Sequence, residues 1–289
     1  MGGYKIVTDA TCDLTDEWAG RIGVDIIPMD VELDGEAYLF GPGGNITGLE
    51  FFRAMAAGKL GSTSQISPAR YEEHFVPYLD QGLDVLYLCF SSGLSGTIQA
   101  AQICMADLRE RYPGRKLVCI DTLCASAGEG FLVNAAAEQQ AAGMDLDALC
   151  AWVEQRIPHV CHWFTVEDLK YLHRGGRISA ATAVMGSALQ IKPVMHCDDA
   201  GHLTNTGKAR GRKHSLLALV DHMDQSWTPE LGEQVFLCHG DCASDAQFMA
   251  DEVRRRRPNA DVAIFPMGPI IGAHCGPGVI AIFSWGSQR

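Results

Sequence analysis

Strand-like and helix-like segments alternate along the first half of the chain, and this alternation constrains its fold more than any other feature. The runs KIVTDAT (5–11), DVLYLCF (84–90) and KLVCIDT (116–122) are short and apolar. One helical pattern follows the second run, and another, covering residues 125–143, follows the third. Strands that alternate with helices form βαβ units with a parallel sheet. We therefore predict an N-terminal α/β domain built on a parallel sheet.

Local signals refine this first domain. Residues 24–33 read as one strand, and Pro28 indicates that the strand lies at an edge or contains a bulge. Thr47 and Glu50 have the spacing of a capping box, which predicts that a helix begins there. Ser67 stands directly before a proline, as the capping residue of a helix often does, so we predict a second helix at that point.

The pattern changes near Pro158. Strand-like runs then follow at less regular spacing, in residues 159–166, 193–199, 202–207, 234–241 and 261–268. Two long helical segments lie among them, at 215–227 and 244–257. The chain has 289 residues, which is more than one hydrophobic core usually serves. We predict two domains, an α/β domain at 1–160 and an α+β domain at 161–289.

Composition and charge exclude several classes of protein. The net charge of −12 argues against a nucleic-acid-binding protein, which normally has a basic face. The first residues have no apolar core of a signal peptide, and no apolar run approaches the ~20 residues that span a bilayer. We therefore expect a cytoplasmic protein without membrane insertion, in which most of the eleven cysteines are small buried apolar groups.

The cysteines also raise the alternative of a metal site. The sequence contains no C-x-x-C pair, although His159, Cys161 and His162 lie close together. These three residues fall on a strand-like run, where neighbouring side chains alternate between the two faces. Because zinc ligands have closely defined spacings, we predict no metal site.

Three clusters of hydroxyl or acidic residues follow predicted strands, and a fourth hydroxyl cluster precedes the helix predicted at Ser67. In an open parallel sheet, ligands bind at the carboxyl ends of the strands. Hydroxyls and free backbone N–H groups near helix N-termini favour an anion such as a carboxylate or a phosphate. An anion site is one interpretation, and ordinary caps and turns are the other. The clusters lie at residues 8–11, 62–65, 91–93 and 121–122.

Ser95 lies in the stretch FSSGLSGT (90–97), where a strand leads into a helix. This setting is similar to the nucleophile elbow G-x-S-x-G of α/β-hydrolases, but here the second glycine comes one residue too early. A serine nucleophile also needs a histidine base held by an acid. A serine hydrolase that uses Ser95 therefore remains the alternative function, with three candidate bases, His196, His239 and His274.

No nucleotide-binding loop is evident. Residues 201–209 superficially resemble a P-loop, but five residues separate the two glycines and Ala209 stands where the loop needs a serine or threonine. No dinucleotide-binding glycine motif follows the first strand either. We predict that the chain has no ATP site of its own and needs no cofactor.

Nine short motifs, in order along nearly the whole chain, are similar to those of the DegV family. These bacterial fatty-acid-binding proteins include the lipid-carrying subunit of fatty acid kinase. The chain departs from the usual family pattern at Ala10, Cys12, Ile66 and the pair His173-Arg174. The motifs are TDATCDL (8–14), TSQIS (63–67), SSGLSGT (91–97), DTLCASAGEG (121–130), LKYLHRGGRIS (169–179), KPV (192–194), GKARGRK (207–213), HGD (239–241) and GPIIGAHCGPG (268–278).

The resemblance implies a long-chain fatty acid bound between two domains. Thr63 and Ser95 would hold its carboxylate, and Ser92 and His274 would lie nearby. The acyl chain would lie in an apolar tunnel. Apolar stripes at 180–191, 215–220 and 262–265 are candidates for its wall, with plain hydrophobic core as the alternative.

The resemblance also implies a carrier rather than an enzyme. In the family's kinase system the carrier presents the carboxylate to a separate ATP-binding subunit, which makes an acyl phosphate. Arg174 and Arg177 are candidates for contact with that kinase or with phosphate, and a solvated surface is the alternative. A module that binds another protein and no lipid is a third possible class of function.

Overall fold

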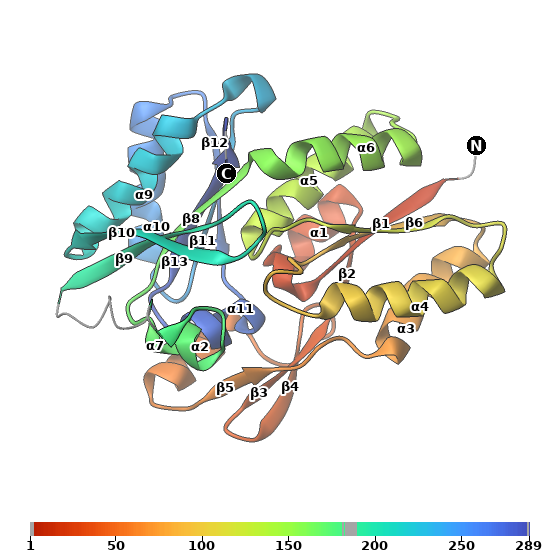
Figure 1. Cartoon of the computed structure of the whole chain (residues 1–289), viewed down its shortest axis with the longest axis horizontal. Coiled ribbons are helices and arrows are strands. Elements are labelled where there is room, and N and C mark those ends of the chain that lie inside the picture. Colours follow the sequence, from red (N-terminus) through yellow and green to blue (C-terminus); the bar gives the residue numbers. More distant parts are fainter. Residues whose placement is uncertain (1–2, 181, 183–189, 288) are drawn as a thin grey trace.

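The computed structural model describes residues 3–180, 182, 190–287 and 289. Its first layer is a parallel sheet of four strands in the order β2-β1-β6-β7 (Figure 1). The predicted parallel sheet is therefore confirmed. The strands are β1 (Tyr4–Asp9), β2 (Asp25–Ile27), β6 (Asp84–Cys89) and β7 (Leu117–Asp121).

Helices cover both faces of this sheet. The helices α3 (Pro68–Asp80) and α4 (Thr97–Arg111) lie along one side, and α5 (Ala127–Ala141) lies on the other (Figure 1). The helix α1 (Asp16–Ile22) packs against β2 and α5, and α6 (Leu146–Arg156) packs against α5. Ser67 caps α3 by accepting a hydrogen bond from the backbone N–H of Arg70, which confirms the predicted start of this helix.

The segment predicted as one strand at 24–33 is divided at Pro28. Residues before it form β2 of the parallel sheet, and residues after it form β3 (Met29–Leu33) of a separate sheet. Proline has no N–H to donate to a strand ladder, so it suits the break between the two sheets. The second sheet has the order β4-β3-β5, with β4 at Glu36–Phe40 and β5 at Gly61–Thr63. The helix α2 (Gly48–Ala56) begins with the predicted capping box of Thr47 and Glu50.

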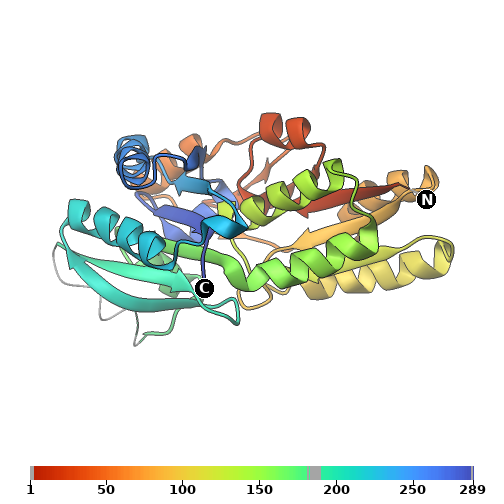
Figure 2. The same cartoon turned by 90° about the horizontal axis from the view of Figure 1, so that it is seen from above.

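The second half of the chain forms a mixed sheet of six strands in the order β10-β9-β8-β13-β11-β12. Within this sheet β11 and β12 pair in parallel, and the other described strand pairs are antiparallel. The helices α9 (Arg212–Ser226) and α10 (Ala243–Arg256) cover one face (Figure 2). The strands are β8 (Val160–Thr165), β9 (Ile191–Cys197), β10 (Leu203–Arg210), β11 (Gln234–His239), β12 (Asp261–Pro266) and β13 (Ile280–Trp285).

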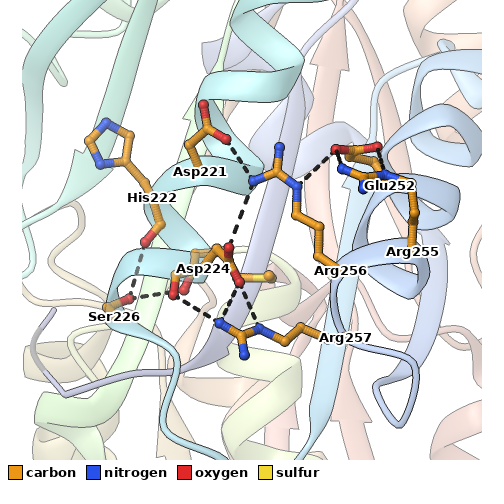
Figure 3. A network of polar contacts seen from close by, with 9 residues as sticks. Asp221, His222, Asp224, Ser226, Glu252, Arg255, Arg256 and Arg257 are labelled. Carbon is orange, nitrogen blue, oxygen red and sulfur yellow. Dashed lines mark hydrogen bonds and ion pairs between the residues drawn. The ribbon is translucent and has the colours of Figure 1, made fainter.

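Ion pairs join α9 to α10 (Figure 3). The Arg256 Nη1 atom lies 2.6 Å from Asp221 Oδ1, and Arg257 Nε lies 2.6 Å from Asp224 Oδ1. The arginines therefore pair with acids of the neighbouring helix. They also lie at the C-terminal end of α10, where positive charges interact favourably with the helix dipole. The helix α10 agrees with the helical segment predicted at 244–257.

The helix α5 is buried along most of its length because the six-stranded sheet covers the side that the parallel sheet does not. Its Phe131 ring packs edge-on against Phe236 of β11 and Trp285 of β13, at centroid distances of 5.3 and 4.8 Å. A single hydrophobic cluster extends from Ile6 on β1 to Trp285. The division of the chain at residue 160 therefore stays a prediction.

Two short helices complete the region that matters for the site. They are α7 (Lys170–Arg174) and α11 (Pro269–Cys275). The glycine-rich motif at 268–278 therefore forms a helix and the turn that follows it. Within the described ranges, no helix is both long and apolar enough to cross a membrane.

Candidate functional site

A cavity of about 360 Å³ lies between the parallel sheet and the six-stranded sheet. Its volume falls within the roughly 300–1,000 Å³ that is usual for small-molecule sites. Residues 63–65, at the end of β5, and residues 94–97, at the start of α4, form part of its wall. Side chains of β8, β13 and α11 form much of the rest. The cavity therefore draws on strands of the two other sheets and on segments that follow strands of the parallel sheet.

Most of the cavity wall is apolar. Phe90, Phe164, Leu172, Ile270 and Ile271 are among the residues that line it. These side chains come from four different segments, so no single stripe of the sequence marks the wall.

The stripes that the sequence suggested for a tunnel do not supply this wall. From these stripes, Leu216, Leu219 and Val220 belong to the hydrophobic cluster between the six-stranded sheet and its covering helices, and Val262 and Ile264 pack against it. Phe265 belongs to the main core. The third stripe, 180–191, falls mostly outside the described residues. For the two described stripes, the alternative of plain core is therefore correct.

Polar side chains gather at one part of the cavity. The Thr63 hydroxyl lies 2.9 Å from the Nε2 atom of His274. Ser95 also lines the cavity, and its hydroxyl lies 2.8 Å from that of Thr97. The pairing of β5 with β3 places Thr63 opposite Val31, and α11 brings His274 to it across 211 positions of sequence. Thr63, Ser95 and His274 therefore line one cavity, as the resemblance implied.

The His274 ring is largely buried, and burial lowers its pKa to about 4. The positive charges of Arg177 and Arg174 lower the pKa further in the same direction. His274 is therefore neutral at pH 7, and its Nδ1 atom has no hydrogen-bond partner among the described residues. When Nε2 carries the ring proton, it donates to Thr63, and the Thr63 O–H is then available to an anion in the cavity.

Arg177 lies in the wall of the cavity rather than on an outer surface for a partner. Its Nε donates to the backbone oxygen of Leu94 at 3.2 Å, and its Nη1 donates to the backbone oxygen of Gly175. Burial lowers the pKa of this guanidinium. Within the described part of the chain it has no acidic partner, so its charge faces the cavity uncompensated. This position was not foreseen from the sequence.

Arg174 is exposed, by contrast. Its guanidinium stacks over the ring of Tyr171 at 5.3 Å from the ring centroid. It remains close enough to lower the pKa of His274. Arg174 is therefore a surface cation beside the polar part of the cavity.

Ser92 is not part of the cavity wall. Its side chain is exposed, and its backbone N–H donates to Asp121 Oδ1 at 3.1 Å. The hydroxyls of Thr8, Thr11 and Ser91 are buried and engaged by other protein groups. The strand-end clusters of β1, β6 and β7 therefore do not jointly form an anion site.

Ser95 lacks the contacts of a serine nucleophile. Among the described residues, no histidine forms a hydrogen bond with its hydroxyl. His274 contacts Thr63 instead, and His239 accepts a hydrogen bond from the backbone N–H of Cys242. His196 stacks on Trp163, on the face of the six-stranded sheet that α9 covers.

Gln65 is a cavity residue that the sequence reading did not single out. It lines the cavity, and its amide packs so closely on Gly96 that a β-carbon there would stand 2.5 Å from Gln65 Nε2. The only sequence signal for it was its place beside Thr63 in the motif TSQIS. In the described part of the chain, no group of three or more His, Cys, Asp or Glu side chains has the arrangement of a metal site.

Residues 4–286 match the family described as uncharacterised proteins of the DegV family. A DegV domain-containing protein of Clostridium perfringens is 36% identical over 289 residues, which cover 100% of this chain and 99% of the relative. A DegV domain-containing protein of Lactococcus lactis is 32% identical over 285 residues, covering 97% of each chain.

Solved structures agree with the sequence relatives. A DegV family protein of Thermus thermophilus, described for its fatty acid binding, superposes with a TM-score of 0.86 at 28% identity, covering 98% of this chain and 99% of the other. A fatty-acid-binding DegV family protein of Streptococcus agalactiae gives a TM-score of 0.85 at 26% identity and covers 100% of both chains.

Proposed function

Since this chain belongs to the DegV family, we propose that it binds a long-chain fatty acid in the cavity between its sheets. The observation that carries the proposal is the make-up of the cavity: an apolar wall with a cluster of hydrogen-bond donors and one uncompensated guanidinium. A fatty acid has the matching shape and chemistry, an alkyl chain with one carboxylate. Relatives from T. thermophilus and S. agalactiae are described as binding fatty acids, which supports the proposal.

In this proposal Thr63, Ser95 and Arg177 contact the carboxylate, with His274 orienting the Thr63 hydroxyl. Residues 1–160 supply the two hydroxyls, and residues 161–289 supply Arg177, His274 and much of the apolar wall. Ser92 has no part, because it does not line the cavity.

The energetics favour firm retention of the ligand. Burial of an alkyl chain of about 16 carbons contributes on the order of 10 kcal/mol, at ~0.8 kcal/mol per methylene. Burial of the carboxylate opposes this unless donors satisfy it. Hydrogen bonds to a charged group are stronger than neutral ones, and a guanidinium adds charge compensation.

We further propose that the protein is a carrier and that a separate ATP-binding kinase subunit converts the bound acid to an acyl phosphate. The absence of a nucleotide-binding loop from the sequence supports this division of labour. Arg174, exposed beside the polar part of the cavity, is the candidate contact for the kinase. A cytoplasmic location belongs to the same proposal, and buried thiols such as those of Cys12, Cys89 and Cys238 suit a reducing compartment.

Organic extraction of the purified protein tests lipid binding directly. We expect mass spectrometry to detect a long-chain fatty acid in close to equimolar amount, because the cavity retains the ligand through purification. Delipidated protein should take up added fatty acid again. Protein that is empty and takes up no fatty acid would contradict the proposal and favour a protein-binding module.

Ester hydrolysis that is abolished by Ser95→Ala would favour the hydrolase alternative instead. Full retention of a bound fatty acid without any turnover of a model ester supports the carrier. Lipid extraction and an esterase assay on the same preparation therefore distinguish a carrier from a hydrolase.

Removal of one hydroxyl from the polar cluster should weaken binding about tenfold or more. Thr63→Val and Ser95→Ala each leave a buried carboxylate short of a donor, which costs roughly 1.5–3 kcal/mol for a charged hydrogen bond. Isothermal titration with a fatty acid measures the effect. Matched controls are Ser62→Ala on β5 and Ser92→Ala in the loop before α4, because both side chains are exposed and outside the cavity wall. Equal affinities for all four variants would show that the carboxylate lies elsewhere.

A further inference from the structure

A chain of buried hydrogen bonds runs beneath the cavity wall. The Glu129 side chain of α5 contacts two threonine hydroxyls, with Oε1 at 2.7 Å from Thr8 and Oε2 at 2.7 Å from Thr11. Thr11 Oγ1 lies 2.5 Å from Asp9 Oδ1, and Thr8 Oγ1 lies 3.0 Å from the backbone oxygen of Leu88. Glu129, Asp9 and Thr8 have no exposed surface.

The contacts in this chain outnumber the hydroxyl protons of its two threonines. Thr8 has one hydroxyl proton for two contacts, and the Leu88 carbonyl can only accept, whereas a carboxyl group can also donate when it is protonated. We therefore assign the Thr8 proton to the carbonyl. The contact between Thr8 and Glu129 Oε1 then needs a proton on the Glu129 carboxyl. Thr11 also has one hydroxyl proton for two carboxyl contacts. Two ionised carboxylates would leave contacts without protons, whereas a neutral Glu129 supplies the donor that the contact with Thr8 lacks.

The electrostatic surroundings agree with this count. Neither carboxyl forms an ion pair within the described residues, and burial raises the pKa of both Glu129 and Asp9. Two buried carboxylates joined by one hydroxyl repel each other strongly at low dielectric. Asp9 is better suited to hold a negative charge, because the hydroxyl of Tyr87 and the backbone N–H of Thr11 donate to it. Several titratable groups face Glu129. Asp9 at the end of β1 and Cys12 and Asp13 just after it are three of them. The others are Tyr87 on β6, which bonds to Asp9, Cys124 before α5, and His162 on β8 beside Gly128.

The chain reaches the cavity through Thr11. Thr11 lines the cavity, and so does Ser126, which directly precedes α5. Thr11 directs its hydroxyl to Asp9 and Glu129, so the bond to Glu129 ties the residues after β1 to the first turn of α5.

We propose that Glu129 is a positioning residue that acts as a neutral carboxylic acid, holding Thr11 and the first turn of α5 in the cavity wall through one buried proton. The consequence for lipid affinity rests on the proposed function, whereas the protonation state does not. Loss of this proton places a second negative charge beside Asp9 and removes the donor to Thr8. The cavity wall then loosens, and ligand retention falls with it.

The direction of the pH dependence follows from the raised pKa of Glu129. The folded protein binds this proton more tightly than the unfolded chain, so the stability contribution of the group falls as pH rises above the unfolded pKa of about 4.3. The fall continues until the pKa of the folded state is reached. Glu129→Gln removes the ionisation and keeps a donor for Thr8 and an acceptor for Thr11.

The test compares the full-length wild type with Glu129→Gln and with Glu138→Gln, an exposed glutamate of the same helix. Melting temperature and palmitate affinity are measured from about pH 6 to about pH 9. We expect wild type and Glu138→Gln to lose stability, and about tenfold in affinity, relative to Glu129→Gln as pH rises. The same pH profile for all three proteins would overturn the inference.

Infrared spectra of delipidated wild-type protein provide a second measurement that does not depend on whether the variant folds. Isotope-labelled glutamate should show the carbonyl band of a protonated carboxyl at pH 7. A spectrum with only ionised glutamate at pH 7 would overturn the inference. A wild type that binds no palmitate but shows this band would refute the proposed function and leave the protonated Glu129 in place.

Discussion

Arg177→Glu should lower the affinity for a long-chain fatty acid by about 100-fold or more. The substitution removes the guanidinium that faces the cavity and puts a carboxylate near the ligand's own carboxylate. Two unit charges about 4 Å apart interact by roughly 4 kcal/mol at an effective dielectric constant of 20, and a hundredfold loss needs only about 2.8 kcal/mol. Titration of delipidated protein with a fatty acid measures the loss.

Two comparisons show whether charge is the cause. Arg174→Glu should leave lipid affinity within a few-fold, since Arg174 is exposed and outside the wall, and should slow acyl-phosphate formation if it contacts the kinase. A fatty alcohol of the same length should bind Arg177→Glu and wild type almost equally, because it has no carboxylate to repel. An Arg177→Glu protein with unchanged melting temperature and unchanged fatty-acid affinity would remove Arg177 from the site.

Phe131→Ala should destabilise the protein by about 3–5 kcal/mol, the usual cost of deleting a buried aromatic ring. Phe131 is fully buried on α5, and its ring contacts Phe236 and Trp285 of the six-stranded sheet. A loss of this size corresponds to a fall in melting temperature of about 10 °C, at roughly 2–4 °C per kcal/mol for a chain of this order of size. Calorimetry at pH 7 measures it.

Ile103→Ala on α4 is the control, because that side chain is 66% exposed. Surface substitutions of this kind usually change stability by less than about 0.5 kcal/mol. If both variants melt within about 2 °C of the wild type, the contacts of Phe131 contribute little to stability. The packing of α5 between the two sheets would then not hold them together.

The alternation of apolar runs and helices was sufficient to predict the parallel sheet, because this pattern depends on local sequence. The strand β13 was missed, although it pairs with both β8 and β11 at the centre of its sheet. All six of its residues are buried, so its sequence IAIFSW lacks the alternation that marks a half-exposed strand. It also follows a glycine-rich stretch, a composition that is typical of turns.

The site was predictable only in part. Motif resemblance pointed to Thr63, Ser95 and His274, and the structure brings them to one cavity. The orientations of Ser92 and Arg177 depend on how loops pack, which periodicity does not report. Burial decides whether a hydroxyl serves the protein or a ligand, and only the fold sets burial.

The sequence around Glu129 contains a signal for a buried polar contact. Glu129 is the one acid in the otherwise apolar and small-residue helical run from 125 to 137. A charged side chain at the centre of such a run conflicts with burial unless it is paired or neutralised. In the structure α5 is buried on both sides, and the hydroxyls of Thr8 and Thr11 satisfy the Glu129 carboxyl by hydrogen bonds.

The position of α5 has a kinetic consequence for ligand exchange. Because α5 is buried along most of its length and packs against both sheets, the two sheets cannot move apart without exposing its apolar side chains. Wide hinge opening would expose the aromatic cluster around Phe131 to water, at a cost comparable to global unfolding. Exchange of a fatty acid is therefore expected to proceed through local displacement of segments at the cavity wall, such as residues 63–65 and 94–97, on the time scale of loop motion.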